Sequence, residues 1–205
     1  GEYHSGSNGD VEAIALAVPA DAISTPVPAE LATLSTSAEA LWTAARSGDF
    51  AKAQSSLDAI TSAWAGVGPS APKNLAVGMN AAVTSATQEV TAKNAIQLAH
   101  AAIDVERWAY DLRLRHQPKD EIDQVRFMLW ARQLAVDVDA TDVAGVRSDT
   151  TTLEWMRDRI AHTFDASTLS AVNTKLKALR TAADAGDLAA AKEAAGALEK
   201  LLPSG

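Results

Sequence analysis

Apolar residues recur at steps of three and four along most of the chain from residue 29 onward. This spacing lines them up on one side of an α-helix. Glycine, proline, aspartate and serine interrupt the pattern where helices start and stop. We therefore predict an all-α protein, an antiparallel bundle of about seven or eight helices. The predicted helices span residues 29–47, 50–65, 72–90, 91–116, 119–145, 150–164, 166–185 and 187–202.

One phrase of this pattern occurs twice: ALWTAARSGDFAKAQSSLDAI returns 138 positions later as ALRTAADAGDLAAAKEAAGAL. In the two copies the pairs Gly48–Asp49 and Gly186–Asp187 separate two helical patterns. Glycine takes up a left-handed turn without a Cβ penalty, and aspartate accepts hydrogen bonds from the first N–H groups of the next helix. We interpret both copies as helical hairpins built on the same glycine turn. An internal duplication is the alternative interpretation.

This hairpin phrase is similar to the helix-turn-helix unit of tetratricopeptide arrays and to the hairpins of cytochrome c prime bundles. The chain lacks the cysteines through which such cytochromes attach haem. In general style, the whole sequence resembles secreted or lipid-anchored helical-bundle proteins of uncharacterised function. That resemblance implies a helical fold and a location outside the cytoplasm, and it implies no particular activity.

The first 28 residues differ in composition from the rest. They begin with glycine and serine, contain Pro19, Pro26 and Pro28, and hold few large apolar side chains. We expect a flexible leader over residues 1–28 and a single helical-bundle domain over residues 29–205. A leader of this kind remains when an export signal or a lipid-anchored cysteine is removed, so we expect an extracytoplasmic protein that meets the membrane only through an N-terminal tether. A cytoplasmic protein is the alternative.

Composition narrows the classes of function. The 205 residues include no cysteine, which excludes disulfides, thiolate metal sites and cysteine nucleophiles. The net charge is −8 and the basic residues are scattered, so nucleic acid is not an expected partner. No apolar run reaches the ~20 residues of a membrane span, and no catalytic motif occurs. We therefore expect a non-catalytic protein without a cofactor.

The fourth and fifth predicted helices each have two apolar sides separated by polar residues. In the fifth helix we expect Arg126 and Asp137 to be interior and the opposite face, which includes Arg132, to be exposed to solvent. Together with the sixth helix, these strips predict a partly buried cluster of nearly balanced charge. Its members are His100, Asp104, Arg107, Asp111, Arg126, Gln133, Asp137 and Arg159.

Three interpretations of this polar cluster remain open. In the first, arginines hold a small anionic ligand by two-point hydrogen bonds in the bundle core, beneath an aromatic side chain. That pocket would use Arg107, Asp111, Arg126, Trp130, Asp137 and Arg159. In the second, His100, Asp104 and His162 hold a metal ion in a carrier or metalloenzyme. In the third, the charges form a buried salt-bridge network in a structural, partner-binding bundle. The function that we expect is an extracytoplasmic binding or interaction module for a small anionic ligand or a protein partner.

Overall fold

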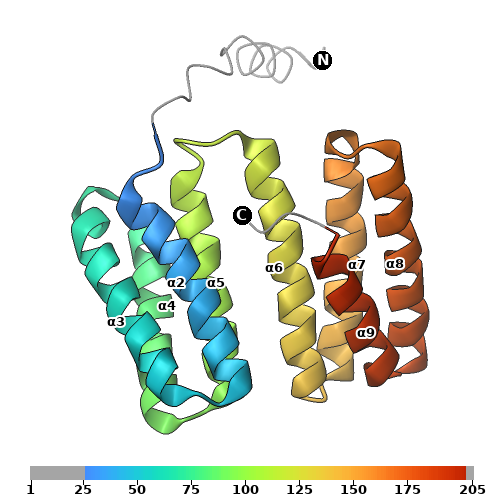
Figure 1. Ribbon diagram of the computed structural model, residues 1–205, viewed down its shortest axis with the longest axis horizontal. Helices are drawn as coiled ribbons and strands as arrows, with labels where there is room; N and C mark the ends of the chain where they lie inside the picture. The colour runs from blue at the N-terminus through green and yellow to red at the C-terminus, as the bar shows by residue number, and fades with distance from the viewer. Residues whose placement is uncertain (1–25, 202–205) are drawn as a thin grey trace, which may run out of the picture.

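Helices account for nearly all of the chain that the computed structural model describes, residues 26–201 (Figure 1). The prediction of an all-α bundle is confirmed for this range, in which no strand occurs. The predicted leader falls mostly on residues 1–25, which lie outside the described residues, as do residues 202–205. No helix in the described range is long and apolar enough to cross a membrane. The helices are α2 (Ala29–Ser47), α3 (Phe50–Val67), α4 (Lys73–Ala92), α5 (Ala95–Arg113), α6 (Lys119–Asp139), α7 (Val143–Ile160), α8 (Ala166–Ala185) and α9 (Leu188–Glu199).

These helices form four antiparallel hairpins whose tight turns lie at the same end of the molecule (Figure 1). Each turn has one residue with φ between +54° and +71°. The next residue is an Asp or Asn whose side chain accepts a hydrogen bond from a backbone N–H three residues further on. The glycine turns predicted at Gly48 and Gly186 are confirmed, and Lys93 and Thr141 form the other two turns.

The predicted boundary between the fifth and sixth helices is wrong, and α5 begins at Ala95, four residues after the start predicted for the fourth helix. The fifth predicted helix, drawn through residue 145, ends at Asp139, because Thr141 adopts the left-handed conformation and Asp142 caps α7. Asp149, which immediately precedes the helix predicted over residues 150–164, lies inside α7 with only 5 % of its surface exposed. The turn contains neither glycine nor proline, so the pattern of residues does not reveal it.

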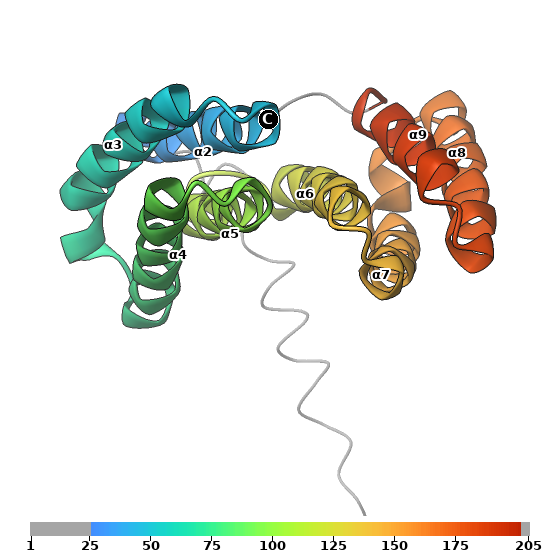
Figure 2. The same ribbon diagram turned by 90° about the horizontal axis from the view of Figure 1, so that it is seen from below.

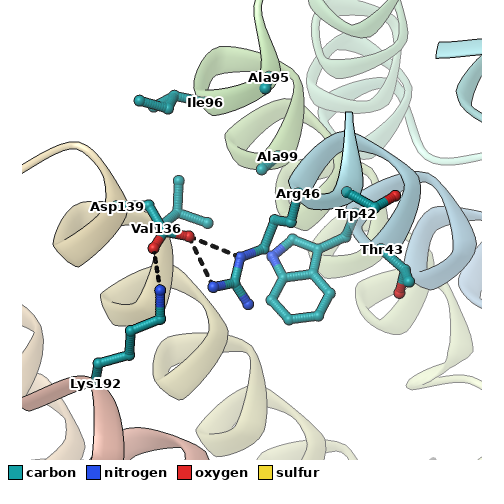
Figure 3. Close-up of a pocket in the computed structure, with 10 residues that line it drawn as sticks. Trp42, Thr43, Arg46, Ala95, Ile96, Ala99, Val136, Asp139 and Lys192 are labelled. Atoms are coloured by element: carbon teal, nitrogen blue, oxygen red, sulfur yellow. Dashed lines mark hydrogen bonds and ion pairs between the residues drawn. The ribbon is translucent and has the colours of Figure 1, made fainter. Parts of the chain in front are cut away.

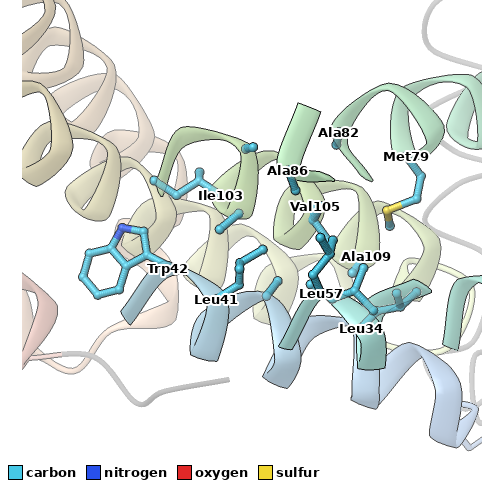
Figure 4. Packing of buried hydrophobic residues seen from close by; sticks show 14 of the residues in the cluster. Leu34, Leu41, Trp42, Leu57, Met79, Ala82, Ala86, Ile103, Val105 and Ala109 are labelled. Carbon is cyan, nitrogen blue, oxygen red and sulfur yellow. The ribbon is translucent and has the colours of Figure 1, made fainter. Parts of the chain in front are cut away.

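The core consists of two hydrophobic clusters that share helix α6. The first cluster lies among α2, α3, α4 and α5 (Figure 4), and the second lies among α7, α8 and α9. Opposite sides of α6 belong to the two clusters, which confirms the two apolar sides predicted for this helix. The first side carries Ile122, Val125, Leu129 and Val136, and the second carries Phe127, Met128, Leu134 and Val138.

The second half of the described chain repeats the helix boundaries of the first half. Helices α3 and α7 each have 18 residues, and α4 and α8 each have 20. Phe50 and Val143, which begin α3 and α7, are 93 positions apart, and the same interval separates the starts of α4 and α8 and those of α5 and α9. Helices α2 and α6 follow this interval to within a few residues. We refer to α2–α5 as the first unit and to α6–α9 as the second unit.

Candidate functional site

A cleft of about 540 Å³ opens where the two units meet (Figure 3). The first unit contributes residues from the C-terminal half of α2 and the start of α5, and the second contributes residues from the end of α6 and from α9. Much of the lining is apolar, and its charged side chains come from three different helices. The lining residues are Trp42, Thr43, Arg46, Ser47, Ala95, Ile96, Ala99, Val136, Asp139 and Lys192.

Two cations in the cleft share one carboxylate. Arg46 donates from Nε and Nη2 to Oδ2 of Asp139 at 3.0 and 2.7 Å, and Lys192 Nζ donates to Oδ1 of the same residue at 2.6 Å (Figure 3). Burial opposes ionisation of Asp139, but the hydrogen bonds from Lys192 and Arg46 hold its pKa below the usual value. The charged lining residues therefore carry a surplus of one positive charge.

Trp42 forms one wall of this cleft and is itself 8 % exposed. Two guanidinium groups approach its ring: Arg46 at 4.8 Å and Arg132 at 5.3 Å from the ring centroid. The indole Nε1–H is buried and has no acceptor among residues 26–201. An unmet buried donor costs roughly 1–3 kcal/mol, so this N–H is a hydrogen-bonding group that the fold leaves unused.

Arg132, on α6, joins both units through three glutamates. Its Nη2 donates to Glu39 Oε1 at 2.5 Å, its Nη1 to Glu106 Oε2 at 3.0 Å and its Nε to Glu199 Oε1 at 3.1 Å. The expectation that Arg132 faces solvent is wrong, since only 3 % of its surface is exposed. The reason is that α2, α5 and α9 all supply partners on that side of α6. Burial, opposed in part by Arg132, raises the pKa of Glu106 to about 7.

The structure brings together part of the polar cluster that the sequence predicts. Arg126 donates to Asp111 and, at 2.9 Å, to Asp123 Oδ1. Arg159 and Lys119 both donate to the other oxygen of Asp123, at 3.0 and 2.8 Å. Asp123, which is 2 % exposed, is the centre of this group and is missing from the predicted cluster, because it follows Asp120 and Glu121 near the start of the helix, where acidic residues are common.

Arg107 lies apart from this group. Its guanidinium packs over Trp130 at 4.5 Å from the ring centroid, and its Nη1 donates to Asp104 Oδ1 at 3.1 Å. The Asp104 side chain is 52 % exposed, so this ion pair is largely solvated. Arg126 and Arg159 thus share Asp123 as an acceptor, whereas Arg107 pairs with Asp104 and does not join them.

A second predicted group forms around Asp137. Gln133 bridges His100 Nδ1 at 2.8 Å and Asp137 Oδ1 at 3.2 Å. Burial and the neighbouring Asp137 carboxyl raise the pKa of Asp149 to about 8. A Cβ at Gly145 would lie 2.4 Å from Asp137 Oδ2, so glycine at this position allows the carboxyl to pack against the backbone of α7.

The predicted metal ligands are not assembled into one site. His100 lies beside Gln133 and Asp137, whereas His162 faces Asp120, with 3.3 Å between His162 Nε2 and a carboxylate oxygen. Across the described residues, no group of three or more His, Asp or Glu side chains is arranged to hold a metal ion.

None of the charged cleft residues belongs to the polar cluster that the sequence predicts. Trp42 and Arg46 lie one turn apart on α2, but the cleft depends on three further helices that come from distant parts of the chain. A local pattern does not show which of these helices meet. No protein-family model, curated protein or solved structure matches this chain.

Proposed function

We propose that the protein is a non-catalytic binding module, and that the cleft between the two units holds a small organic carboxylate with an apolar body. From the composition of the leader, the proposal includes a location outside the cytoplasm. One observation carries the choice of ligand: Arg46 and Lys192, from different units, converge on a single carboxylate above an apolar lining. Arginine and lysine are the side chains that bind carboxylates by charge-assisted hydrogen bonds.

The size and lining of the cleft support a ligand of this kind. Ligand sites have volumes of about 300–1,000 Å³ and are mostly apolar with a few convergent polar groups, and they favour the boundaries between packed units. The cleft has about 540 Å³ and lies at such a boundary. Ile96, Ala99 and Val136 offer apolar contacts to the ligand body, while its carboxylate competes with Asp139 for the two cations.

Charge also decides which way the ligand lies. The Arg132 group beside Trp42 contains three glutamates and one arginine, so that end of the boundary repels the carboxylate of the ligand. The ligand carboxylate therefore lies at the Arg46 and Lys192 end, and the apolar body extends toward the indole ring.

The residues first predicted to bind a ligand have a different role in this proposal. Arg126 and Arg159 are held by Asp111 and Asp123, and these pairs link α5, α6 and α7. We assign this group to fixing the relative positions of the three helices. Arg132 and its glutamates fix α2, α5 and α9 in the same way.

Octanoate is a suitable probe, because it combines a carboxylate with an apolar chain that the cleft can enclose. Isothermal titration calorimetry should show saturable binding of octanoate and much weaker binding of octanol and octylammonium. Arg46→Gln and Lys192→Gln should each weaken octanoate binding about tenfold or more, which corresponds to ~1.4 kcal/mol. Lys73→Gln is the matched control, since Lys73 is exposed and does not line the cleft. Equal binding of octanol, or octanoate binding unaffected by both cleft variants, would contradict the proposal.

A further inference from the structure

We infer that the chain is a tandem duplication: two copies of one four-helix unit, docked about an approximate two-fold axis as in a homodimer. The surface formed by α2 and α5 of the first unit thus packs against a second, diverged copy of the unit, which the chain itself provides as α6–α9. This inference goes beyond the proposed function and does not rest on it, because it concerns how the two units meet and not what the cleft binds.

The first support is the match of residues at the interval of 93 positions. Buried core positions recur at this interval although their residues differ, as with Leu34 and Phe127 or Met79 and Val172. Turn residues recur as well: Asp49 caps α3 as Asp142 caps α7. Few residues are identical, so the repeat lies in burial and helix boundaries more than in the letters of the sequence.

A side-chain hydrogen bond recurs in the same place in both units. In the first unit Trp64 Nε1 donates to Asn80 Oδ1 at 2.7 Å, which links α3 to α4. In the second unit Arg157 donates to Asn173 and links α7 to α8. Trp64 and Arg157 are 93 positions apart, and so are Asn80 and Asn173. The donor has changed, but the asparagine acceptor and the two helices it connects correspond.

The second support is the arrangement of the units in space. Seen roughly along the helices, α2 and α6 lie on opposite sides of the centre of the molecule, and so do α3 and α7, and α4 and α8 (Figure 2). The ion pairs that cross between the units join α2 and α5 of the first unit to α6 of the second, so α2 meets its counterpart α6, and α9 adds Lys192 to the cleft between them. A surface that meets its own counterpart is the property of a two-fold, isologous interface.

The third support is the identity of the residues that meet. Glu39 pairs with Arg132 at 2.5 Å and Arg46 pairs with Asp139 at 2.7 Å. The members of each pair are 93 positions apart, so each residue faces its own counterpart, as residues near a two-fold axis do. Glu106 and Glu199 also correspond, and both bind Arg132.

Opposite charges at these corresponding positions make the two faces complementary. Two identical copies would bring glutamate against glutamate and arginine against arginine near the axis, which is unfavourable. With Arg132 and Asp139 in the second unit, each face instead attracts its counterpart. The cleft lies on this same axis, because Thr43 and Val136, and also Ala99 and Lys192, are corresponding pairs within its lining.

The test uses the folded full-length chain with a protease site inserted in the connector at residues 114–118, between α5 and α6. After cleavage, the two units should stay together on size-exclusion chromatography and show a measurable dissociation constant. Arg46→Asp, which places two carboxylates opposite each other, should raise that constant tenfold or more. Adding Asp139→Arg should restore most of the loss, while Lys73→Asp, away from the boundary, should change nothing.

Two results would overturn the inference. One is separation of the units after cleavage of the otherwise unchanged protein. The other is a double variant, Arg46→Asp with Asp139→Arg, that associates no better than Arg46→Asp alone. Circular dichroism of each uncleaved variant distinguishes a weakened boundary from a chain that fails to fold, and a double variant that fails to fold also counts against the inference.

Discussion

Buried carboxyl groups are the residues at which this fold departs most from an ordinary helical bundle. Asp137 and Asp149 are 7 % and 5 % exposed, and burial raises the pKa of both. The first unit has Ala44 and Ser56 at the corresponding positions, so the shared architecture does not require an acidic pair there. Two carboxyl groups that face each other in a dry site hold a proton between them.

This pair predicts that the protein loses stability as pH rises. Asp149 has a pKa of about 8 in the folded protein and an ordinary value of 3.8, so the folded state binds more protons in the interval between them. The free energy of unfolding should fall by up to about 4 kcal/mol between pH 5 and pH 9, since each of the roughly three pH units below the folded pKa contributes about 1.4 kcal/mol. His100, Arg107 and Gln133 face the pair and oppose this rise in pKa, whereas the neighbouring Asp142 carboxylate adds to it.

Urea unfolding at several pH values, followed by circular dichroism, measures the slope. Asp149→Asn should reduce it, because the amide donates to Asp137 at every pH. Asp58→Asn, at an exposed position of α3, should leave the slope unchanged. A stability that rises from pH 5 to pH 9, or a slope that Asp149→Asn does not reduce, would show that the pair does not share a proton. Glu106, whose pKa is raised to about 7, contributes in the same direction and sets the slope that remains.

The close approach of Asp137 to Gly145 predicts that a larger residue at this position destabilises the protein. A Cβ there would lie 2.4 Å from Asp137 Oδ2, closer than atoms can approach without a shift. Gly145→Ala should therefore lower the free energy of unfolding by about 1–3 kcal/mol, even though alanine favours helices. Gly196→Ala is the matched control, since nothing lies within 4 Å of its added Cβ, and it should stabilise the protein by up to ~1 kcal/mol. Equal effects of both substitutions in urea unfolding would refute this account of Gly145.

At the scale of single elements, the sequence predicts helices well and predicts turns only where glycine marks them. The hairpins at Gly48 and Gly186 follow from turn chemistry alone. The turn at Thr141 does not, because threonine rarely adopts positive φ and the apolar spacing continues across it. Here the packing of α6 and α7 in the second core cluster determines the turn, and local propensity is overridden.

The left-handed backbone conformation of Thr141 predicts that glycine at this position stabilises the protein. A β-branched residue at φ +57° carries strain that glycine does not, so Thr141→Gly should raise the free energy of unfolding by about 1 kcal/mol. Gly48→Ala, at φ +70°, should lower it by a similar amount. Thermal unfolding should therefore show a higher melting temperature for Thr141→Gly and a lower one for Gly48→Ala. A destabilised Thr141→Gly protein would mean that the threonine side chain contributes more than its backbone costs.

Helix α6 shows what the sequence leaves undecided about the site. Its two apolar sides are evident from spacing, but spacing alone does not show which of the two polar flanks is covered. Both flanks are partly buried, Asp137 on one and Arg132 on the other. An exposed Arg132 suits a helix with two neighbours, but α6 has partners on α2, α5, α7 and α9, so Arg132 is buried.

At the scale of the whole molecule, the repeat explains both the fold and the position of the cleft. The sequence phrase that recurs after 138 positions lies in the first and the fourth hairpins. The two units, by contrast, repeat after 93 positions. The longer interval was visible in the sequence because both hairpins contain Gly-Asp. The shorter one was not, because corresponding turns pair Gly48 with Thr141 and Lys93 with Gly186.

Charged side chains lie at the boundary between the two units. The ion pair between Arg46 and Asp139 crosses this boundary, so separating the units would leave Arg46 without its acceptor, whereas Lys192 and Asp139 both belong to the second unit. The cleft is therefore a property of the docked pair and not of a single unit. This is also why no local motif in the chain indicates it.

The indole resonances of the five tryptophans in a ¹⁵N-labelled sample test the binding claim most directly. Trp42→Phe identifies the Trp42 Nε1–H signal, which reports on a donor at the wall of the cleft that has no acceptor within residues 26–201. On addition of octanoate, that signal should shift with saturation, more than the other four, and the shift should be lost in Lys192→Gln. A Trp42 signal that stays in place while octanoate binds would contradict the assignment of the ligand to the cleft.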